Sequence, residues 1–178
     1  MKRRIFFPVF VVLLLSPLIS ISLRGAGQKP LNIVDYFLLL PQDYLENPPQ
    51  SWLTFLRQPK AGVVDVANGY LACIGDGAQP EFEVALFRYR DGRPLLAICH
   101  GELEGPDSVH LDFFEIGPDG KMKKTRRSIF PVGDSGSDKG NWRFQLPRNG
   151  RTILVRTKGS GKIQRKLMWN GEKFQEEK

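Results

Sequence analysis

The chain has 178 residues and a formal net charge of +7, and 41% of its residues are hydrophobic and 25% charged. This composition excludes a disordered or low-complexity chain, because such chains hold too few apolar side chains to form a core. The length beyond the amino-terminal hydrophobic segment, roughly 150 residues, suffices for one domain and excludes a large multidomain enzyme. With 18 glycines and 13 prolines, the sequence favours short elements and many turns over helical bundles.

The amino terminus has the pattern of a secretory signal. Three basic residues at positions 2–4 precede an apolar run over residues 5–23, and no Asp or Glu occurs before residue 35. A positive segment followed by a hydrophobic one directs a chain to export. Small residues close behind the run suit cleavage, so we predict a signal peptide over residues 1–27.

An uncleaved membrane anchor is the alternative that the same run leaves open. An apolar segment over residues 5–23 can cross a bilayer about 30 Å thick if its prolines are tolerated. In both cases the rest of the chain lies outside the cytoplasm, in the periplasm or the extracellular space. The sequence contains no Asn-x-Ser/Thr acceptor, which is compatible with an exported bacterial protein.

Residues 28–60 carry the helix signals of the chain. Asn32, with Asp35 three residues later, forms a capping-box pattern before an apolar stretch that Pro41 ends. A second helical turn is predicted to begin at a Ser51 cap. We therefore expect a short helical segment ahead of the rest of the domain.

Residues 61–178 have the turn chemistry of an antiparallel β domain. Asn-Gly and Asp-Gly dipeptides accept the positive φ angles of tight hairpins. They occur between apolar runs at Asn68-Gly69, Asp91-Gly92, Asp119-Gly120, Asn149-Gly150 and Asn170-Gly171. The expected fold is mainly β: an antiparallel meander of about eight to ten strands, arranged as a sandwich or a barrel.

These dipeptides also predict strand registers, if their two residues form the turn. At Asn149-Gly150, Phe144 then lies opposite Val155. Leu146 lies opposite Ile153 in the same register. Apolar side chains meet in both pairs, as expected for two strands that share one buried face.

The same rule gives a sensible result at Asn170-Gly171. It places Leu167 opposite Phe174, which is a packing pair. It also places Arg165 opposite Glu176, which is an ion pair. We therefore expect the chain to end in a β-hairpin.

Charge changes sign along the predicted mature chain. Residues 28–120 hold 6 basic and 14 acidic residues, whereas residues 121–178 hold 16 basic and 5 acidic ones. A basic half attracts an anionic partner, such as a cell-envelope polymer or lipid headgroups. The candidate ligand-binding residues are those of the densest basic run: Lys121, Lys123, Lys124, Arg126 and Arg127.

A structural interpretation of the same charges competes with this one. The two halves can lie side by side and neutralise each other, and a lysine-rich strand also keeps an exposed sheet edge from pairing with other molecules. No aromatic residue is interleaved with the basic run. A single-stranded nucleic acid is therefore not expected as a partner, because its bases would have nothing to stack on.

The only cysteines are Cys73 and Cys99. One disulfide is the default expectation for such a pair in an exported protein. The predicted meander, however, separates them by two strand spacings, roughly 9–10 Å, which is beyond the reach of a disulfide. A disulfide and two buried thiols therefore both stay open.

No convincing catalytic site is visible, and no cofactor motif occurs. The rule applied at Asp91-Gly92 places Cys99 opposite Val84, and it places Glu83 opposite His100. A carboxylate beside an imidazole lacks the nucleophile that covalent catalysis needs. The two histidines and two cysteines have no diagnostic metal-ligand spacing, so no metal site is predicted.

Three functional hypotheses follow. We expect a binding or structural module, not an enzyme, that contacts an anionic envelope component through its basic half. The second hypothesis is an inhibitor of an envelope or extracellular hydrolase, which would present the loop Gly133–Gly140 to a protein partner. The third is a small hydrolase that uses Glu83 and His100.

Overall fold

The computed structural model describes residues 30–74, 81–101, 109–125, 127–133 and 142–177. Leu31–Lys178 forms one compact unit. The predicted signal peptide, residues 1–27, lies outside the described residues, so its cleavage stays a prediction. In the part of the chain that is described, no helix combines the length and the hydropathy that crossing a bilayer requires.

The helical segment contains two short helices. Helix α1 (Ile33–Leu38) has the predicted capping box: the Asn32 side chain accepts from the Val34 N–H at 2.8 Å, and the Asp35 carboxylate accepts from the Asn32 N–H at 2.8 Å. Helix α2 (Pro49–Leu56) does not begin at a Ser51 cap, since Ser51 lies inside it. Instead Pro49 occupies the first turn, where its missing N–H costs no hydrogen bond.

The strands form two antiparallel sheets in which each strand pairs with its neighbours in sequence. The first sheet contains β1 (Gly62–Asp65), β2 (Tyr70–Cys73), β3 (Phe82–Arg88), β4 (Pro94–Gly101), β5 (Val109–Ile116) and β6 (Met122–Lys124). The second contains β7 (Trp142–Gln145), β8 (Thr152–Thr157), β9 (Ile163–Trp169) and β10 (Phe174–Glu176), and a short 3₁₀ helix (Arg127–Ile129) follows β6. The expected mainly β meander is confirmed, and the sheets are not closed into a barrel.

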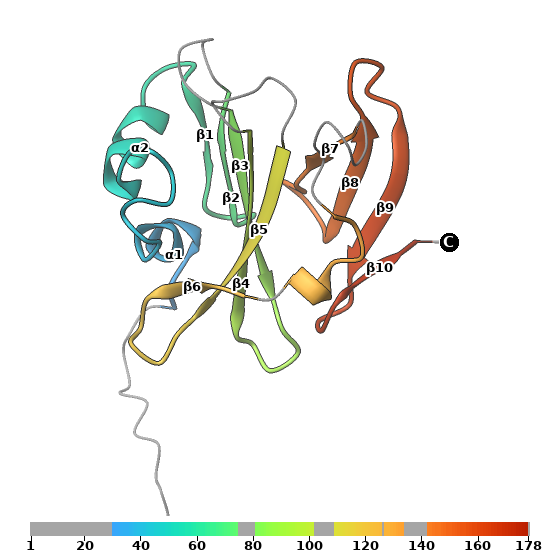
Figure 1. Ribbon diagram of the computed structural model, residues 1–178. Helices are drawn as coiled ribbons and strands as arrows, with labels where there is room; N and C mark the ends of the chain where they lie inside the picture. The colour runs from blue at the N-terminus through green and yellow to red at the C-terminus, as the bar shows by residue number, and fades with distance from the viewer. Residues whose placement is uncertain (1–29, 75–80, 102–108, 126, 134–141, 178) are drawn as a thin grey trace, which may run out of the picture. The chain divides into compact units, whose positions relative to one another are not determined.

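The six-stranded sheet is covered on both faces (Figure 1). One face packs against the four-stranded sheet through a core that includes Leu95, Ala97 and Phe113, together with Trp169 and Phe174 from the second sheet. The other face packs against α1 and α2. Burial on both sides explains why β4 is a continuous apolar run and not an alternating one.

The register of the β3–β4 hairpin differs from the prediction by one residue. Glu83 lies opposite Cys99, because the turn has three residues instead of two. The Tyr89 N–H donates to the Arg93 carbonyl at 2.9 Å, and Gly92 takes the left-handed conformation at φ +85° as the last loop residue. This is the three-residue loop in which a left-handed residue forms a bulge.

A one-residue shift moves every side chain to the opposite face. Glu83 and Cys99 therefore lie on the sandwich side of the sheet, whereas His100 lies opposite Phe82 on the helix side. The prediction that Glu83 faces His100 is wrong. The reason is that the sequence Asp-Gly fits both a two-residue and a three-residue loop.

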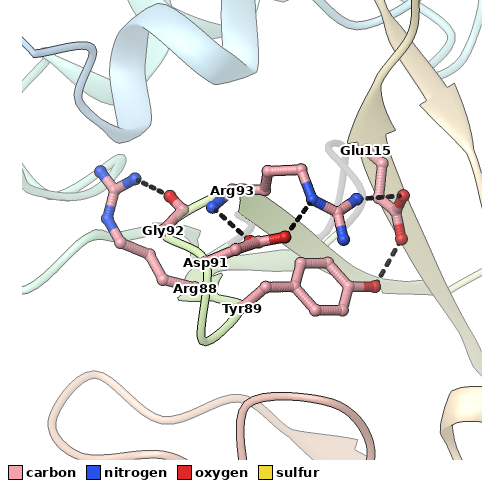
Figure 2. A network of polar contacts seen from close by, with 6 residues as sticks. All are labelled: Arg88, Tyr89, Asp91, Gly92, Arg93 and Glu115. Carbon is pink, nitrogen blue, oxygen red and sulfur yellow. Dashed lines mark hydrogen bonds and ion pairs between the residues drawn. The ribbon is translucent and has the colours of Figure 1, made fainter.

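Figure 2 shows the polar network that braces this hairpin. The Tyr89 hydroxyl donates to the Glu115 carboxylate on β5, and the Arg93 guanidinium lies 4.7 Å from the centroid of the Tyr89 ring. Arg93 also pairs with Asp91 at 2.7 Å and with Glu115 at 3.7 Å. These contacts fix the hairpin against the neighbouring strand, although exposed ion pairs each contribute little to stability.

The β7–β8 register agrees with the prediction. Phe144 lies opposite Val155, and the ladder ends at the pair of Gln145 with Leu154. Leu146 and Ile153 lie just beyond that pair, and both are buried in the sandwich core. The Asn-Gly rule is therefore right at this hairpin.

The last hairpin is shifted by two residues. Phe174 lies opposite Trp169, because Gly171 and Glu172 occupy the centre of the turn between Asn170 and Lys173. A shift of two keeps every side chain on its predicted face. The predicted ion pair consequently forms on the diagonal, with Arg165 donating to both Glu176 oxygens at 3.0 and 2.9 Å.

The turn at Gly92 provides a direct test of this hairpin. Gly92→Ala should lower the free energy of unfolding by about 1–2 kcal/mol, since an L side chain is strained in the left-handed region. No heavy atom lies within 4 Å of the added Cβ, so the strain acts alone. Gly133→Ala, which is equally uncrowded but has no positive φ, should change stability little in the same urea titration. Equal losses would contradict the register.

Candidate functional site

The predicted basic run begins at Lys121, just before β6, and continues through this edge strand of the six-stranded sheet. Lys123 pairs with Asp119 at 3.3 Å, and Lys124 pairs with Asp112 at 2.8 Å. The exposed side chain of Lys121 has no acidic partner among the described residues. Arg126 and the side chain of Arg127 lie outside the description. The described part of the run is therefore largely neutralised within the fold.

Asp112 is the one buried charged residue in the described ranges, with 7% of its surface exposed. Its carboxylate accepts from the Tyr44 hydroxyl at 2.9 Å and pairs with Lys124. Tyr44 belongs to the connection between α1 and α2, and its ring packs edge-on against Phe114. This group ties the connection to the sheet, and the charge of Lys124 compensates the buried carboxylate.

Two histidines lie beside this group. His100 and His110 are directly paired between β4 and β5, with ring centroids 5.7 Å apart. Burial lowers the pKa of His100, and its Nε2 is buried without a hydrogen-bond partner within the described structure. No three His, Cys, Asp or Glu side chains of the described residues converge on one point that could hold a metal ion. The two histidines therefore fit a structural role, in which an uncharged His100 packs against His110.

The hydrogen bond between Tyr44 and Asp112 can be tested by removing the hydroxyl oxygen of Tyr44. Tyr44→Phe should lower the free energy of unfolding by about 1–2 kcal/mol, because the buried carboxylate loses a hydrogen-bond donor. Tyr36→Phe is the matched control, since no hydrogen bond of the Tyr36 hydroxyl is found in the described structure. The two losses are compared by urea denaturation, and a larger loss at Tyr36 would contradict the assignment.

A partly buried carboxylate lies on the sandwich side of the sheet. Glu83 accepts from the Tyr70 hydroxyl at 3.0 Å and from the Leu146 N–H, next to β7, at 2.6 Å. Burial raises the pKa of Glu83. His100 lies on the opposite face, so it cannot exchange a proton directly with Glu83. The sheet therefore separates Glu83 from His100, the two residues of the hydrolase hypothesis.

The two cysteines belong to different layers. Cys73 is buried beneath the helices, whereas Cys99 is buried between the sheets, where its Sγ lies 3.6 Å from the Phe144 carbonyl. The structure holds both as thiols. Side chains on opposite faces of a sheet point apart, which is the geometry that a disulfide does not tolerate.

The sequence reasoning overlooked two arginines on the outer face of the four-stranded sheet. Arg143 on β7 lies directly opposite Arg156 on β8. Their neighbours Phe144 and Val155 point into the core, so both arginines point outward by the alternation of a strand. A two-residue turn at Asn149-Gly150 implies this opposition, because both arginines lie six residues from the turn.

Arg156 is held in place by its surroundings. Its Nε donates to the Gln145 side chain at 2.6 Å, and its Nη1 donates to the Gly161 carbonyl at 2.8 Å. Gln145 lies on β7 two residues from Arg143 and shares its face. We call Arg143 and Arg156 the arginine pair. Neither forms an ion pair with an acidic side chain of the described residues, although the charge of Arg143 acts on the Glu83 carboxylate and opposes the rise of its pKa.

Two other arginines of the same half are neutralised. Arg148 pairs with Asp65 at 2.7 Å, and Arg165 pairs with Glu176 at 2.9 Å. A hydrogen bond from Asn68, followed by that from Arg148, lowers the pKa of Asp65 to about 2. The absence of an ion pair therefore distinguishes the arginine pair from Arg148 and Arg165.

The far side of the outer face is less basic. Lys166 lies opposite Leu154, and Glu177 accepts from the Thr152 hydroxyl at 2.7 Å beside β10. The far side of the outer face therefore carries charges of both signs. The loop Gly133–Gly140 falls almost wholly outside the described residues, and so does any role for it.

No family model matches this chain, and no curated protein or solved structure matches it significantly.

Proposed function

We propose that the protein is an exported binding module that holds an anionic polymer of the cell envelope against the outer face of its four-stranded sheet. The arginine pair carries this proposal. The pair consists of two like charges directly opposite each other in a sheet, and neither forms an ion pair with a carboxylate of the described residues. An anionic partner supplies the missing counter-charge.

The energetics of the sheet support this assignment. Like charges directly opposite each other destabilise a strand pair, whereas opposite charges stabilise it by roughly 0.2–1 kcal/mol. Arg143 and Arg156 therefore weaken the β7–β8 contact in the isolated protein. Binding of an anion between them removes this repulsion and adds charge-assisted hydrogen bonds.

The arginine pair is favoured over the basic run as the contact surface. Lys123 and Lys124 already have carboxylate partners, and Lys124 neutralises a buried aspartate. An external ligand would compete with these internal pairs. It would displace no described ion pair at Arg143, and it would leave both internal hydrogen bonds of Arg156 intact.

The test compares two double variants that each remove two positive charges. Arg143→Gln/Arg156→Gln neutralises the arginine pair, and Lys121→Gln/Lys123→Gln neutralises one exposed charge on β6 and one just before it. Binding of the purified protein to polyphosphate, polyglutamate, dextran sulfate and anionic lipid vesicles is measured across a salt series. We expect binding to at least one soluble polymer to weaken steeply with salt.

The variants decide where that polymer binds. The arginine variant should bind about tenfold or more weakly, because it loses charged hydrogen bonds, while the lysine variant should bind nearly as the natural protein does. Equal losses in both variants would show that net charge alone matters. Binding to vesicles but to no polymer would replace the proposed ligand by a lipid surface.

A further inference from the structure

We infer that the anionic group recognised by the arginine pair is a phosphate. This inference rests on the proposed function and specifies its ligand. It is based on the guanidinium groups of the site and on the orientation of the Arg156 side chain.

The site is built from guanidinium groups. A guanidinium is a planar fork that donates two parallel hydrogen bonds, whereas an ammonium group acts as a point charge. Residues directly opposite each other in an antiparallel pair have Cβ atoms about 4.5–5.5 Å apart. The fork of Arg143 and the remaining donors of Arg156 can therefore reach a single anion from two neighbouring strands.

One of the forks is oriented before any ligand binds. The bonds from Arg156 to Gln145 and to the Gly161 carbonyl use its Nε and one N–H of Nη1. The donors of Nη2 stay available. Binding consequently costs less side-chain entropy at Arg156 than at a free arginine, which favours a directional ligand over a diffuse cloud of counterions.

The shape of the anion decides between carboxylate and phosphate. A carboxylate presents its two oxygens in one plane, and one guanidinium fork satisfies it. Donors that approach from two strands, the Arg143 fork and the remaining donors of Arg156, fit oxygens that are arranged tetrahedrally.

The experiment uses a charge-conserving variant of the full protein. Arg143→Lys/Arg156→Lys keeps both positive charges but removes both forks. Affinities for polyphosphate, polyglutamate and dextran sulfate are compared at one ionic strength, and inorganic phosphate is added as a competitor against chloride at that same ionic strength. Thermal unfolding verifies that each variant is folded.

We expect the natural protein to bind polyphosphate about tenfold or more tightly than polyglutamate. The lysine substitutions should abolish this preference while a steep salt dependence persists, and inorganic phosphate should displace the polymer only from the natural protein. Equal affinities for all three polymers, or a preference that survives the lysine substitutions, would overturn the phosphate assignment and leave the proposed function standing. Unchanged binding in Arg143→Gln/Arg156→Gln would overturn both.

Discussion

Trp169→Ala is expected to lower the free energy of unfolding by about 3–5 kcal/mol. The Trp169 side chain is 1% exposed in the core between the two sheets. Its ring packs against Phe174 and against Phe87 of the other sheet, with centroids 4.9 and 6.2 Å apart. Its Nε1 donates to the Arg88 carbonyl at 2.7 Å. One side chain thus joins the sheets by packing and by a hydrogen bond.

Two further variants separate these contributions. Trp169→Phe should cost about 1–2 kcal/mol, because it keeps an aromatic ring in the core but leaves the Arg88 carbonyl without this donor. Met168→Ala affects the adjacent residue, which is 45% exposed on the outer face, and should cost less than about 1 kcal/mol. Urea denaturation of the three variants measures the differences. A loss at Met168 as large as that at Trp169 would show that the two faces of β9 are wrongly assigned.

The element types could be predicted from local sequence because each has a local physical cause. The capping box at Asn32 and the glycine-containing turns act over three or four residues, so a pattern of that length reveals them. The strand registers could not all be predicted from local sequence. Asp91-Gly92 and Asn170-Gly171 each fit more than one loop length, and only the packing of whole strands selects among them.

The candidate sites likewise contain one contact that local sequence implies and one that depends on long-range packing. The opposition of Arg143 and Arg156 follows from the Asn149-Gly150 turn, so it was within reach of sequence reasoning. The bond between Tyr44 and Asp112 joins residues 68 positions apart. No local pattern records such a contact, because it depends on how the α1–α2 connection lies on the sheet.

A second large effect is expected at Glu83. Glu83→Ala should lower the free energy of unfolding by about 2–4 kcal/mol, because the Leu146 N–H and the Tyr70 hydroxyl both lose their partner in a largely buried place. Glu83→Gln keeps an oxygen for the Leu146 N–H, and its amide can donate to the Tyr70 oxygen. The glutamine variant should therefore be much more stable than the alanine variant at pH 7.

The pH dependence at Glu83 has an unusual sign for a carboxylate. Burial raises its pKa above the ordinary 4.5 in the folded state. Between the unfolded and the folded pKa, the folded protein binds more protons than the unfolded chain does. Stability contributed by Glu83 is then complete below the unfolded pKa and declines as the pH rises through the folded pKa.

Urea denaturation between about pH 4 and pH 7 tests this sign. Relative to the natural protein, Glu83→Gln should gain stability as the pH rises, since the variant has no carboxylate to ionise in the core. Glu46→Gln, which removes a carboxylate from an exposed position, controls for the change in net charge and should follow the natural protein. If Glu83→Gln instead lost stability relative to the natural protein with rising pH, the carboxylate would be stabilised as an anion by the Leu146 N–H and the Tyr70 hydroxyl. Those two hydrogen bonds would then outweigh the cost of burying the charge between the sheets.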